Sequence, residues 1–269
     1  MSKTTYTVET LKVGDLEVDH RVQREGLKVK KVEEIYRNYN DDAVGVITVS
    51  RRTDRGLYII DGWHRVEVIR RLTDNAGEIE CHVFEGLTVA EEALMFLALN
   101  FSEKVTLLDK FKVRLTAGDP VALAIDEMVS YYGWKISSSP ANAHVNAVGV
   151  LERLYNLSVK IEAEPNLVQG VFLVISRAWG IERYASQAVI LEGLGRLMAE
   201  HGSKLEVDRL VESLASYKGG PQTLHAEAGR LAAIRKGKVS MAVAELITEE
   251  YNRGLKTDRR KLDPWRARS

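Results

Sequence analysis

The segment that most constrains the fold runs from Leu57 to Leu72. Residues 57–60 are apolar, β-branched or aromatic, and the pair Asp61-Gly62 ends this run. Apolar residues then recur three and four positions apart from residue 63 onward. The first pattern is typical of a buried strand and the second of one face of a helix, while Asp-Gly marks a turn. The sequence therefore predicts a strand, a tight turn and a helix in immediate succession.

The turn between these two elements is a candidate anion site. The first turn of a helix leaves backbone N–H groups unpaired and carries partial positive charge. Gly62 would let a ligand approach the backbone, and His64 and Arg65 would add donors where a phosphate lies. Asp61 could cap the helix or take part in metal or base chemistry. The alternative is an ordinary turn whose Arg65 pairs with a local carboxylate.

The residues of this turn, Asp61-Gly62-Trp63-His64-Arg65, resemble the signature loop of the ParB/sulfiredoxin superfamily. Residues 16–19 and 21–24 resemble the entry strand and the Gln-Pro-Arg segment of that superfamily. Asn100 stands where ParB proteins carry the Asn of a second motif. The resemblance covers residues 7–118, and the chain as a whole resembles ParB-like proteins of actinobacteria and their phages.

The resemblance implies a ligand and a set of residues that hold it. The ligand would be a nucleotide triphosphate, CTP or ATP, with or without Mg. The implied phosphate- and nucleotide-binding residues are Gly62, His64, Arg65, Arg24, Gln23 and Asn100. For the segment around Arg24, which also holds Lys28, Lys30 and Lys31, a solvated basic face is an equal alternative. The resemblance further implies DNA as a partner and a homodimer.

Two positions depart from the pattern of CTP-hydrolysing ParB proteins. Those proteins have Glu before the Asn and Arg three residues after it, whereas this chain has Leu99 and Glu103. Phosphoryl transfer depends on positioned cations and metal, so the departure argues against hydrolysis but leaves nucleotide binding open. In free-serine kinases of the superfamily the Asp equivalent to Asp61 belongs to the catalytic loop, so a small-molecule phosphotransferase is an alternative. Whether the chain is an enzyme stays open.

Other chemistries have less support from the residues. A ParB-like nuclease ranks low, because no cluster of carboxylates would hold two metal ions. Trp63 occupies the position of the reactive Cys of sulfiredoxins, and an indole is not a nucleophile. Cys81 lies in a predicted strand and is expected to be a small core residue. The six His residues show no zinc-site spacing, so we expect no metal site.

Composition limits the possible partners. The chain has 269 residues, 45% apolar content, and 38 basic against 38 acidic side chains. This content supports a sizeable core, and the even charge balance means that DNA contact must come from local patches. The predicted contacts are in the C-terminal tail, at Arg259, Arg260, Lys261 and Arg266. With one Cys and no membrane-length apolar run, we expect a cytoplasmic protein without a membrane partner.

The pattern of elements predicts two domains and a tail. In the first part, 6–18 suggests a strand pair, 29–39 a helix, 44–49 and 57–60 a hairpin, and 79–84 a strand. The capping box Thr88 to Glu91 begins a helix that runs to Leu99. Further helices are predicted over 106–116, 120–133, 145–155, 165–179, 186–201, 207–217, 221–235 and 240–252. We therefore expect an α/β, ParB/sulfiredoxin-like domain with a mixed sheet over 1–118, an all-α domain over 119–254, and a basic tail over 255–269.

Overall fold

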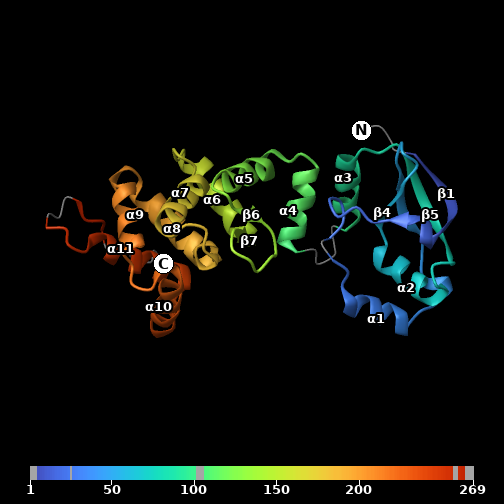
Figure 1. Ribbon diagram of the computed structural model, residues 1–269. Coiled ribbons are helices and arrows are strands. Elements are labelled where there is room, and N and C mark those ends of the chain that lie inside the picture. The colour runs from blue at the N-terminus through green and yellow to red at the C-terminus, as the bar shows by residue number, and fades with distance from the viewer. Residues whose placement is uncertain (1–4, 25, 101–105, 257–259, 264–269) are drawn as a thin grey trace. The chain divides into compact units, whose positions relative to one another are not determined.

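A computed structural model describes residues 5–24, 26–100, 106–256 and 260–263 (Figure 1). The chain divides into two compact units after Ala122. The first unit contains a five-stranded sheet with helices on both faces, and the second is built almost entirely of helices. The predicted fold class, an α/β part followed by a helical part, is confirmed.

The sheet of the first unit is mixed. Its strands are β1 (Tyr6–Lys12), β2 (Leu16–Glu17), β3 (Ile47–Arg51), β4 (Leu57–Asp61) and β5 (Glu78–Glu85). Their order is β1-β5-β3-β4-β2, with β1·β5 and β3·β4 antiparallel and β3·β5 and β2·β4 parallel. The predicted hairpin is the β3·β4 pair. In this order β4, which ends at Asp61, lies between β3 and the edge strand β2.

The strand pair predicted over residues 6–18 is wrong in its pairing. Both strands exist, but β1 and β2 lie at opposite edges of the sheet. They are joined by a short 3-10 turn, η1 (Val13–Asp15), and Val13 and Leu16 are both buried in the core. Burial of these two apolar side chains favours this connection over a hairpin between neighbouring strands.

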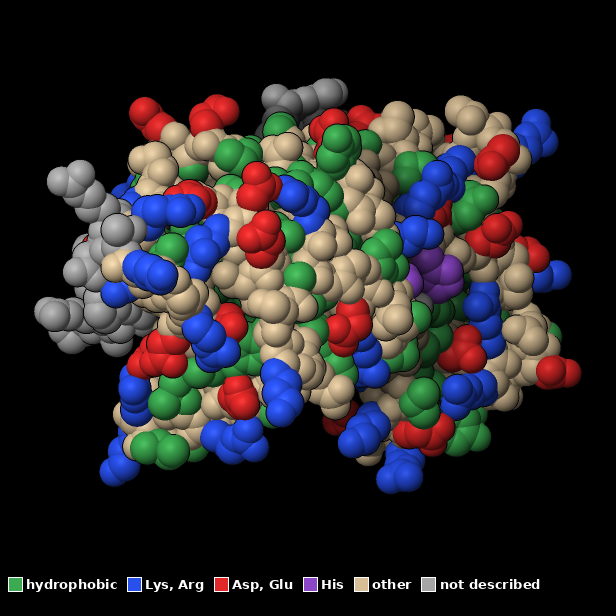
Figure 2. All heavy atoms as spheres, turned by 60° about the vertical axis from the view of Figure 1, so that its left-hand side comes forward, with side chains coloured by type: hydrophobic (Ala, Val, Ile, Leu, Met, Phe, Trp, Pro, Cys, Tyr) green, Lys and Arg blue, Asp and Glu red, His purple; other side chains and the backbone are tan. Residues whose placement is uncertain are grey.

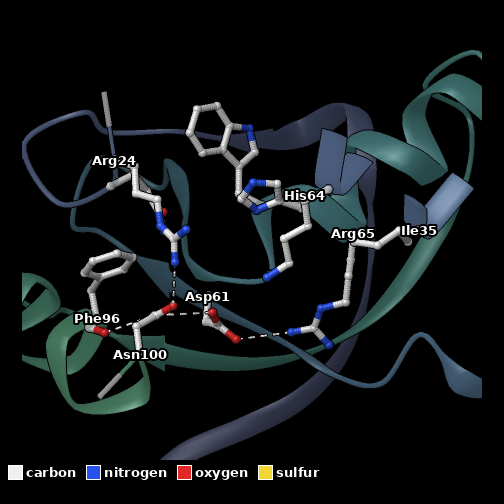
Figure 3. A pocket seen from close by; sticks show the side chains of 11 residues that line it. Arg24, Ile35, Asp61, His64, Arg65, Phe96 and Asn100 are labelled. Carbon is white, nitrogen blue, oxygen red and sulfur yellow. Dashed lines mark hydrogen bonds and ion pairs between the residues drawn. The ribbon is translucent and has the colours of Figure 1, made fainter. Parts of the chain in front are cut away.

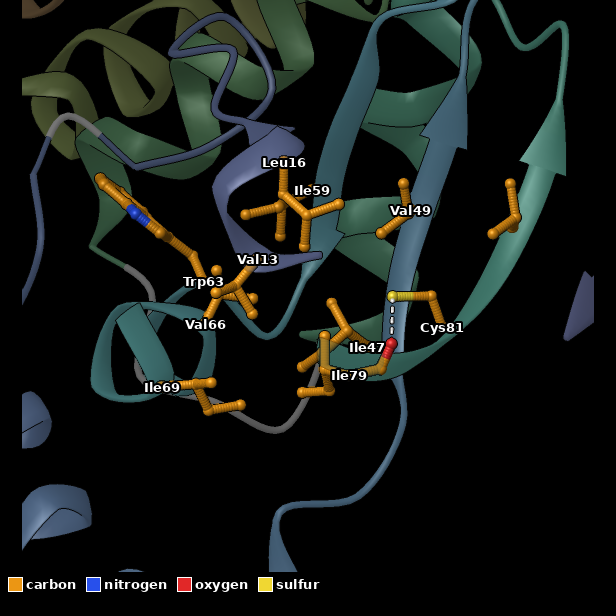
Figure 4. Close-up of a cluster of buried hydrophobic side chains, with 11 residues drawn as sticks. Val13, Leu16, Ile47, Val49, Ile59, Trp63, Val66, Ile69, Ile79 and Cys81 are labelled. Atoms are coloured by element: carbon orange, nitrogen blue, oxygen red, sulfur yellow. Dashed lines mark hydrogen bonds between the residues drawn. The ribbon is translucent and has the colours of Figure 1, made fainter. Parts of the chain in front are cut away.

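Two apolar cores lie on opposite faces of the sheet. Ile59 packs with α2 (Trp63–Thr73) in a cluster that also contains Cys81, whereas the next residue, Ile60, packs with α3 (Val89–Leu99) and α4 (Leu107–Thr116) (Figure 4). Successive side chains of a strand point to opposite faces, so an unbroken apolar run indicates burial on both. Burial of Cys81 is confirmed, and desolvation raises the pKa of its thiol to about 11.

The capping box predicted at Thr88 and Glu91 is confirmed. The backbone N–H of Glu91 donates to Thr88 Oγ1 (3.3 Å), and the N–H of Thr88 donates to Glu91 Oε2 (2.9 Å). This reciprocal pair satisfies two N–H groups that the helix itself cannot pair. It holds the start of α3, whose far end carries Asn100.

Apart from α1 (Val29–Arg37) of the first unit, the remaining α-helices lie in the second unit. They are α5 (Pro120–Tyr131), which spans the division, α6 (Val148–Ile161), α7 (Leu167–Trp179), α8 (Ala188–His201), α9 (Val207–Ala215), α10 (Gly220–Arg235) and α11 (Val239–Asn252). Val171, Phe172 and Ile175 of α7 are fully buried. A short parallel pair, β6 (Lys135–Ile136) with β7 (His144–Val145), was not predicted, because two-residue strands are too short to show a period. Within the described residues, no helix combines the length and apolar character that crossing a bilayer requires.

Candidate functional site

The residues predicted to bind a nucleotide gather at one cavity of the first unit (Figure 3). The cavity has a volume of about 240 Å³ and lies where the end of β4, the start of α2, the end of α3 and α1 (Val29–Arg37) meet. Its lining residues are Gln23, Arg24, Lys31, Ile35, Asp61, Gly62, Trp63, His64, Arg65, Phe96 and Asn100. Ligand binding by these residues stays a prediction.

Gly62 forms the turn between β4 and α2. It is the N-cap of α2 with φ of 99°, and no side chain caps the helix, so Asp61 does not act as a cap. This φ belongs to the left-handed region that favours glycine. A Cβ at this position would collide with Ile47 Cδ1 and lie 3.0 Å from Arg65 Nη2. The glycine is therefore required by its backbone angle and by its neighbours, and its predicted approach to a ligand stays a prediction.

Asp61 and Arg65, which both line the cavity, form an ion pair. Arg65 Nη2 donates to Asp61 Oδ2 (3.1 Å), while Arg65 Nη1 donates to the carbonyl oxygens of Val44 (2.8 Å) and Val46 (3.2 Å). The pairing expected of an ordinary turn is thus present. It does not exclude a ligand, because a partly exposed carboxylate can be displaced from a guanidinium fork by a stronger anion.

A buried polar network extends from this pair to the other wall of the cavity. Asn100 Nδ2 donates to Asp61 Oδ1 (3.4 Å) and to the carbonyl oxygen of Phe96 (3.0 Å). Arg24 Nη2 donates to Asn100 Oδ1 (3.4 Å). Arg24 and Asn100 are each only 5% exposed. Buried polar groups persist when they are hydrogen-bonded, so Asn100 holds Arg24 and Asp61 at fixed places around the cavity.

Gln23 has a structural role that the sequence did not indicate. Its Nε2 donates to the carbonyl oxygens of Ile59 (2.9 Å) and Ile60 (2.6 Å) on β4. These bonds tie the segment before α1 to the strand that ends in Asp61. The amide nitrogen of Gln23 is therefore engaged with the backbone, and its contribution to the cavity is to place Arg24 beside it.

His64 is also engaged. Its ring is buried, and Nε2 accepts the backbone N–H of Lys28 (3.2 Å), next to the start of α1. In a neutral imidazole the nitrogen that accepts has no proton to donate, so Nδ1 carries it. Nε2 is therefore engaged with the backbone, and phosphate binding by His64 stays a prediction. Its observed role is to hold α1 against the start of α2.

Lys31 is a cavity residue that sequence reasoning did not single out. It lies in the first turn of α1 and lines the cavity with Arg24 and Arg65. Its only sequence signal was membership of the basic segment after Arg24. With three cationic side chains and the single carboxylate of Asp61, the ionised groups of the lining carry a net charge of plus two.

A second ionic network supports the site from outside the cavity. Arg52 donates through Nη2 to Glu92 Oε2 (2.5 Å) and to Asp19 Oδ2 (2.8 Å), and its guanidinium lies 3.7 Å from the Tyr58 ring centroid. Hydrogen bonds from Arg21 and then Arg52 lower the pKa of the Asp19 carboxyl, and the bond to Glu92 raises the pKa of Arg52. The partners are distant in sequence, so no local pattern showed them. The network holds α3, and hence Asn100, against the sheet.

The predicted DNA contacts are described only in part. Arg259 and Arg266 lie outside the described residues. Arg260 forms a forked pair with Glu206 (Nη2 to Oε2 2.5 Å), and Lys261 is partly buried. Leu262 is buried and its backbone bonds to the Asn252 side chain. The described part of the tail is therefore folded against helices rather than free.

Charge on the visible surface is mixed. Figure 2 shows Lys and Arg side chains interspersed with Asp and Glu over the face in view. Among the described residues, no group of three His, Cys, Asp or Glu side chains is placed to hold a metal ion. Within the described part of the chain, the first unit thus offers a cavity lined by three cations and no group of such side chains placed to hold a metal ion.

Comparisons with known proteins place the chain in a family. No curated protein matches it. Among solved structures, it is similar to a Pnob8-like ParB-N domain, with 11% identity over 87% of this chain and 99% of that chain and a TM-score of 0.41. Residues 19–240 match the family described as "Family of unknown function (DUF6551)". Because this match spans most of the chain, including every residue that lines the cavity, the chain belongs to the DUF6551 family.

Proposed function

We propose that the chain is a ParB-like regulatory module that binds a nucleotide through its phosphates in the cavity at Asp61-Gly62-Trp63-His64-Arg65. One observation carries the proposal. Arg24, Lys31 and Arg65 come from three separate segments and line one cavity around the single carboxylate of Asp61. A net charge of plus two beside the first turn of a helix suits the charge of a phosphate group.

Arg65 is the main phosphate ligand in this proposal. The carbonyl oxygens of Val44 and Val46 orient one edge of its guanidinium, so the other edge keeps its direction toward the cavity. A phosphate oxygen would replace Asp61 on Nη2, and charge-assisted bonds from a guanidinium fork to phosphate are stronger than neutral ones. A side chain already held in its binding geometry loses little conformational entropy when the ligand arrives.

The test is the thermal stability of the protein with CTP, ATP, GTP and ADP, each with and without Mg. A ligand at a hundred times its Kd stabilises a protein by about 2.7 kcal/mol, which is a shift of several degrees in Tm. The shift should disappear in Arg65→Ala and shrink in Lys31→Ala. Arg71→Ala is the matched control, because Arg71 lies on the same helix outside the cavity. A wild-type Tm that no nucleotide moves would refute the proposal.

Binding without turnover is the expected behaviour. The residue before Asn100 is Leu99, whose side chain is half exposed and has no group that can hold a metal ion. Because phosphoryl transfer requires positioned metal and cations, we expect slow or no hydrolysis of the bound nucleotide. Release of inorganic phosphate at a rate well above background would contradict this part of the proposal.

Phosphotransfer to a small molecule is the second candidate, and the position of Asp61 favours it. Its carboxylate lies within the cavity between Arg65 and Asn100, where it could position an acceptor hydroxyl or a metal ion. This function requires loss of ATP or ADP that depends on an added acceptor such as free serine. The activity should vanish in Asp61→Asn while nucleotide binding persists.

DNA association is the third element of the proposal and comes from the ParB resemblance and the basic tail. Binding through phosphates predicts an affinity that falls as salt rises. Neutralising the tail should lower the affinity for DNA and the dependence of that affinity on salt. The substitutions are Arg259→Gln, Arg260→Gln, Lys261→Gln and Arg266→Gln. Binding that is absent, or insensitive to salt, would remove this element. Sedimentation with and without nucleotide would test the proposed homodimer.

A further inference from the structure

A second cavity adjoins the phosphate cavity, and we infer that it receives the base of a nucleoside phosphate. This inference rests on the proposed function and deepens it. The second cavity has a volume of about 410 Å³ and lies between α1 and the segment before β3. Lys31, Ile35 and Arg65 line both cavities, so the two are neighbours with a common wall.

Arg65 is the part of the common wall whose guanidinium bonds to residues of both cavities. Its Nη2 bonds to Asp61, which lines only the first cavity, and its Nη1 bonds to the carbonyl oxygen of Val44, which lines only the second. Figure 3 shows Ile35 and Arg65 together on one side of the first cavity. A ligand whose phosphate contacts Arg65 therefore has the second cavity within reach of its remaining atoms.

The two cavities differ in chemistry. Both cavities are lined by Lys31, Arg65 and one carboxylate, but the first adds Arg24, whereas the second adds the apolar side chains of Ala43 and Val44 and the ring of Tyr39. Ligand sites commonly combine apolar walls with a few polar groups that set orientation. The first cavity suits an anion, and the second suits a flat group that is apolar on its faces.

Tyr39 contributes its ring rather than its hydroxyl. The hydroxyl donates to Asp41 Oδ1 (2.6 Å), and this bond raises the pKa of Tyr39 to about 12. The bond holds the phenol in one place, and the ring also packs against the core cluster of the sheet. A fixed aromatic ring on the wall of a cavity favours stacking or edge contact with another ring.

Part of the lining of the second cavity is polar. Asn38 and Glu34 lie there, and Asn38 Nδ2 donates to the backbone oxygen of Glu34 (2.9 Å). Amide and carboxylate oxygens accept hydrogen bonds, and a nucleobase carries donors on its edge. A sugar phosphate has no flat group to place between Tyr39 and Val44. Nucleoside phosphates are therefore the class of ligand that fits both cavities.

Calorimetric titration with pyrophosphate, ribose 5-phosphate, ADP and CDP tests this assignment. The wild-type protein should bind the better of the two nucleoside diphosphates at least about tenfold more tightly than pyrophosphate or ribose 5-phosphate. Tyr39→Ala should lower the affinity for that nucleoside diphosphate about tenfold and leave the affinity for pyrophosphate unchanged. Tyr39→Phe, which keeps the ring, should bind as the wild type does. If Tyr39→Ala fails to fold, Ala43→Phe should obstruct the second cavity with the same selectivity.

The outcomes separate this inference from the proposed function. Pyrophosphate and nucleoside diphosphates of equal affinity would overturn the second cavity as a base site and leave the phosphate site standing. The base site would also be overturned if Tyr39→Ala lowered the affinities for pyrophosphate and the nucleoside diphosphate equally, or changed neither. Absence of binding by every probe would overturn the phosphate site and with it this inference.

Discussion

The guanidinium of Arg65 lies beside the position where a side chain on Gly62 would begin, 3.0 Å from Nη2 to that Cβ. A Cβ on Gly45 would likewise lie 3.3 Å from Nη1 of the same guanidinium. Both glycines have positive φ, 99° for Gly62 and 69° for Gly45. Arg65 thus passes between two positions that exclude side chains. The glycine of the signature turn makes room for the arginine that we propose as the phosphate ligand.

Gly62→Ala should destabilise the protein by about 3 kcal/mol. A left-handed backbone costs an L-residue about 1 kcal/mol, and overpacking typically costs about 1–3 kcal/mol more. The new Cβ would meet Ile47 Cδ1 and crowd Arg65. Chemical denaturation measures the change. Ile47→Val, which removes Cδ1, should recover part of the loss in the double variant.

Gly86→Ala is the control for that prediction. Gly86 also has positive φ (66°), but a Cβ there meets nothing within 4 Å. The Gly86→Ala substitution should lower the free energy of unfolding only by the cost of the left-handed backbone, about 1 kcal/mol. Equal losses in the two variants would show that Gly62 is required by its backbone angle alone and that contact with Ile47 and Arg65 is unimportant.

Asp61→Asn should tighten binding of pyrophosphate in the absence of metal. The substitution removes the carboxylate that competes for Arg65 Nη2 and keeps an oxygen for Asn100. A partly exposed ion pair contributes about 1 kcal/mol, so the affinity should rise roughly fivefold. Titration calorimetry measures it, with Glu67→Gln on α2 as the control outside the cavity. Weaker binding would indicate that Asp61 takes part in holding the ligand.

Arg52→Met should be among the more destabilising single substitutions in the first unit. Glu92 is 1% exposed and would lose the guanidinium that compensates its charge. Leaving one member of a buried pair unpaired costs about 3 kcal/mol or more. Replacing both partners, as in Arg52→Met with Glu92→Leu, should cost less than the single change. Urea unfolding of the wild type, Arg52→Met and the double variant measures this, and a double variant no more stable than Arg52→Met would contradict it.

The exposed pair Arg71 and Glu33 provides the comparison for Arg52. Both side chains are more than 40% exposed, and their nitrogen and oxygen atoms lie 3.0 Å apart. Ion pairs at the surface contribute little, so Arg71→Met should change the free energy of unfolding by less than about 1 kcal/mol. The two arginines should differ because of burial rather than bond length.

Asp19 should make the stability depend on pH in the acid range. Its pKa is lower in the folded state, so the folded protein holds its proton less tightly than the unfolded chain. The stabilisation that ionised Asp19 provides is therefore complete above the pKa of an unfolded Asp, about 3.9. It is lost as pH falls toward the pKa of Asp19 in the folded protein. Asp19→Asn should lower the stability by roughly 1–2 kcal/mol at neutral pH. The difference from the wild type should shrink below about pH 4.

The matched control for this pH effect is Asp15→Asn, because Asp15 is an exposed carboxylate in η1. It should leave the pH profile of the free energy of unfolding close to that of the wild type. A gap between wild type and Asp19→Asn that persists undiminished into acid would contradict the role assigned to the Asp19 carboxylate.

Cys81 should be unreactive in the folded protein. Burial raises the pKa of its thiol to about 11, and the thiolate is the reactive form. Around pH 8 roughly one thiol in a thousand would be ionised, and the side chain is enclosed in the core of the sheet. A thiol reagent should therefore modify Cys81 in urea but not in native buffer. Rapid native labelling would show that the strand β5 opens locally.

Local features of the chain could be predicted because they depend on neighbours in sequence. The succession of β4, turn and α2 follows from apolar spacing over residues 57–72, and the start of α3 follows from Thr88 and Glu91. Burial of Cys81 follows from alternation along β5. No local pattern joins residues as far apart as Arg24, Arg65 and Asn100. Only the family resemblance predicts that they lie at one cavity.

The sequence by itself determined where strands and helices form and which faces they bury, because side-chain periodicity and capping act over a few residues. Only the tertiary structure decided that β1 and β2 lie at opposite edges, that Gln23 bonds to β4, that His64 accepts from Lys28, and that Arg65 divides two cavities. These relationships depend on which segments the packed core brings together. The position of the turn at residues 61–65 can therefore be predicted from the sequence. The hydrogen-bond partners of its side chains come from distant segments, which only folding brings together.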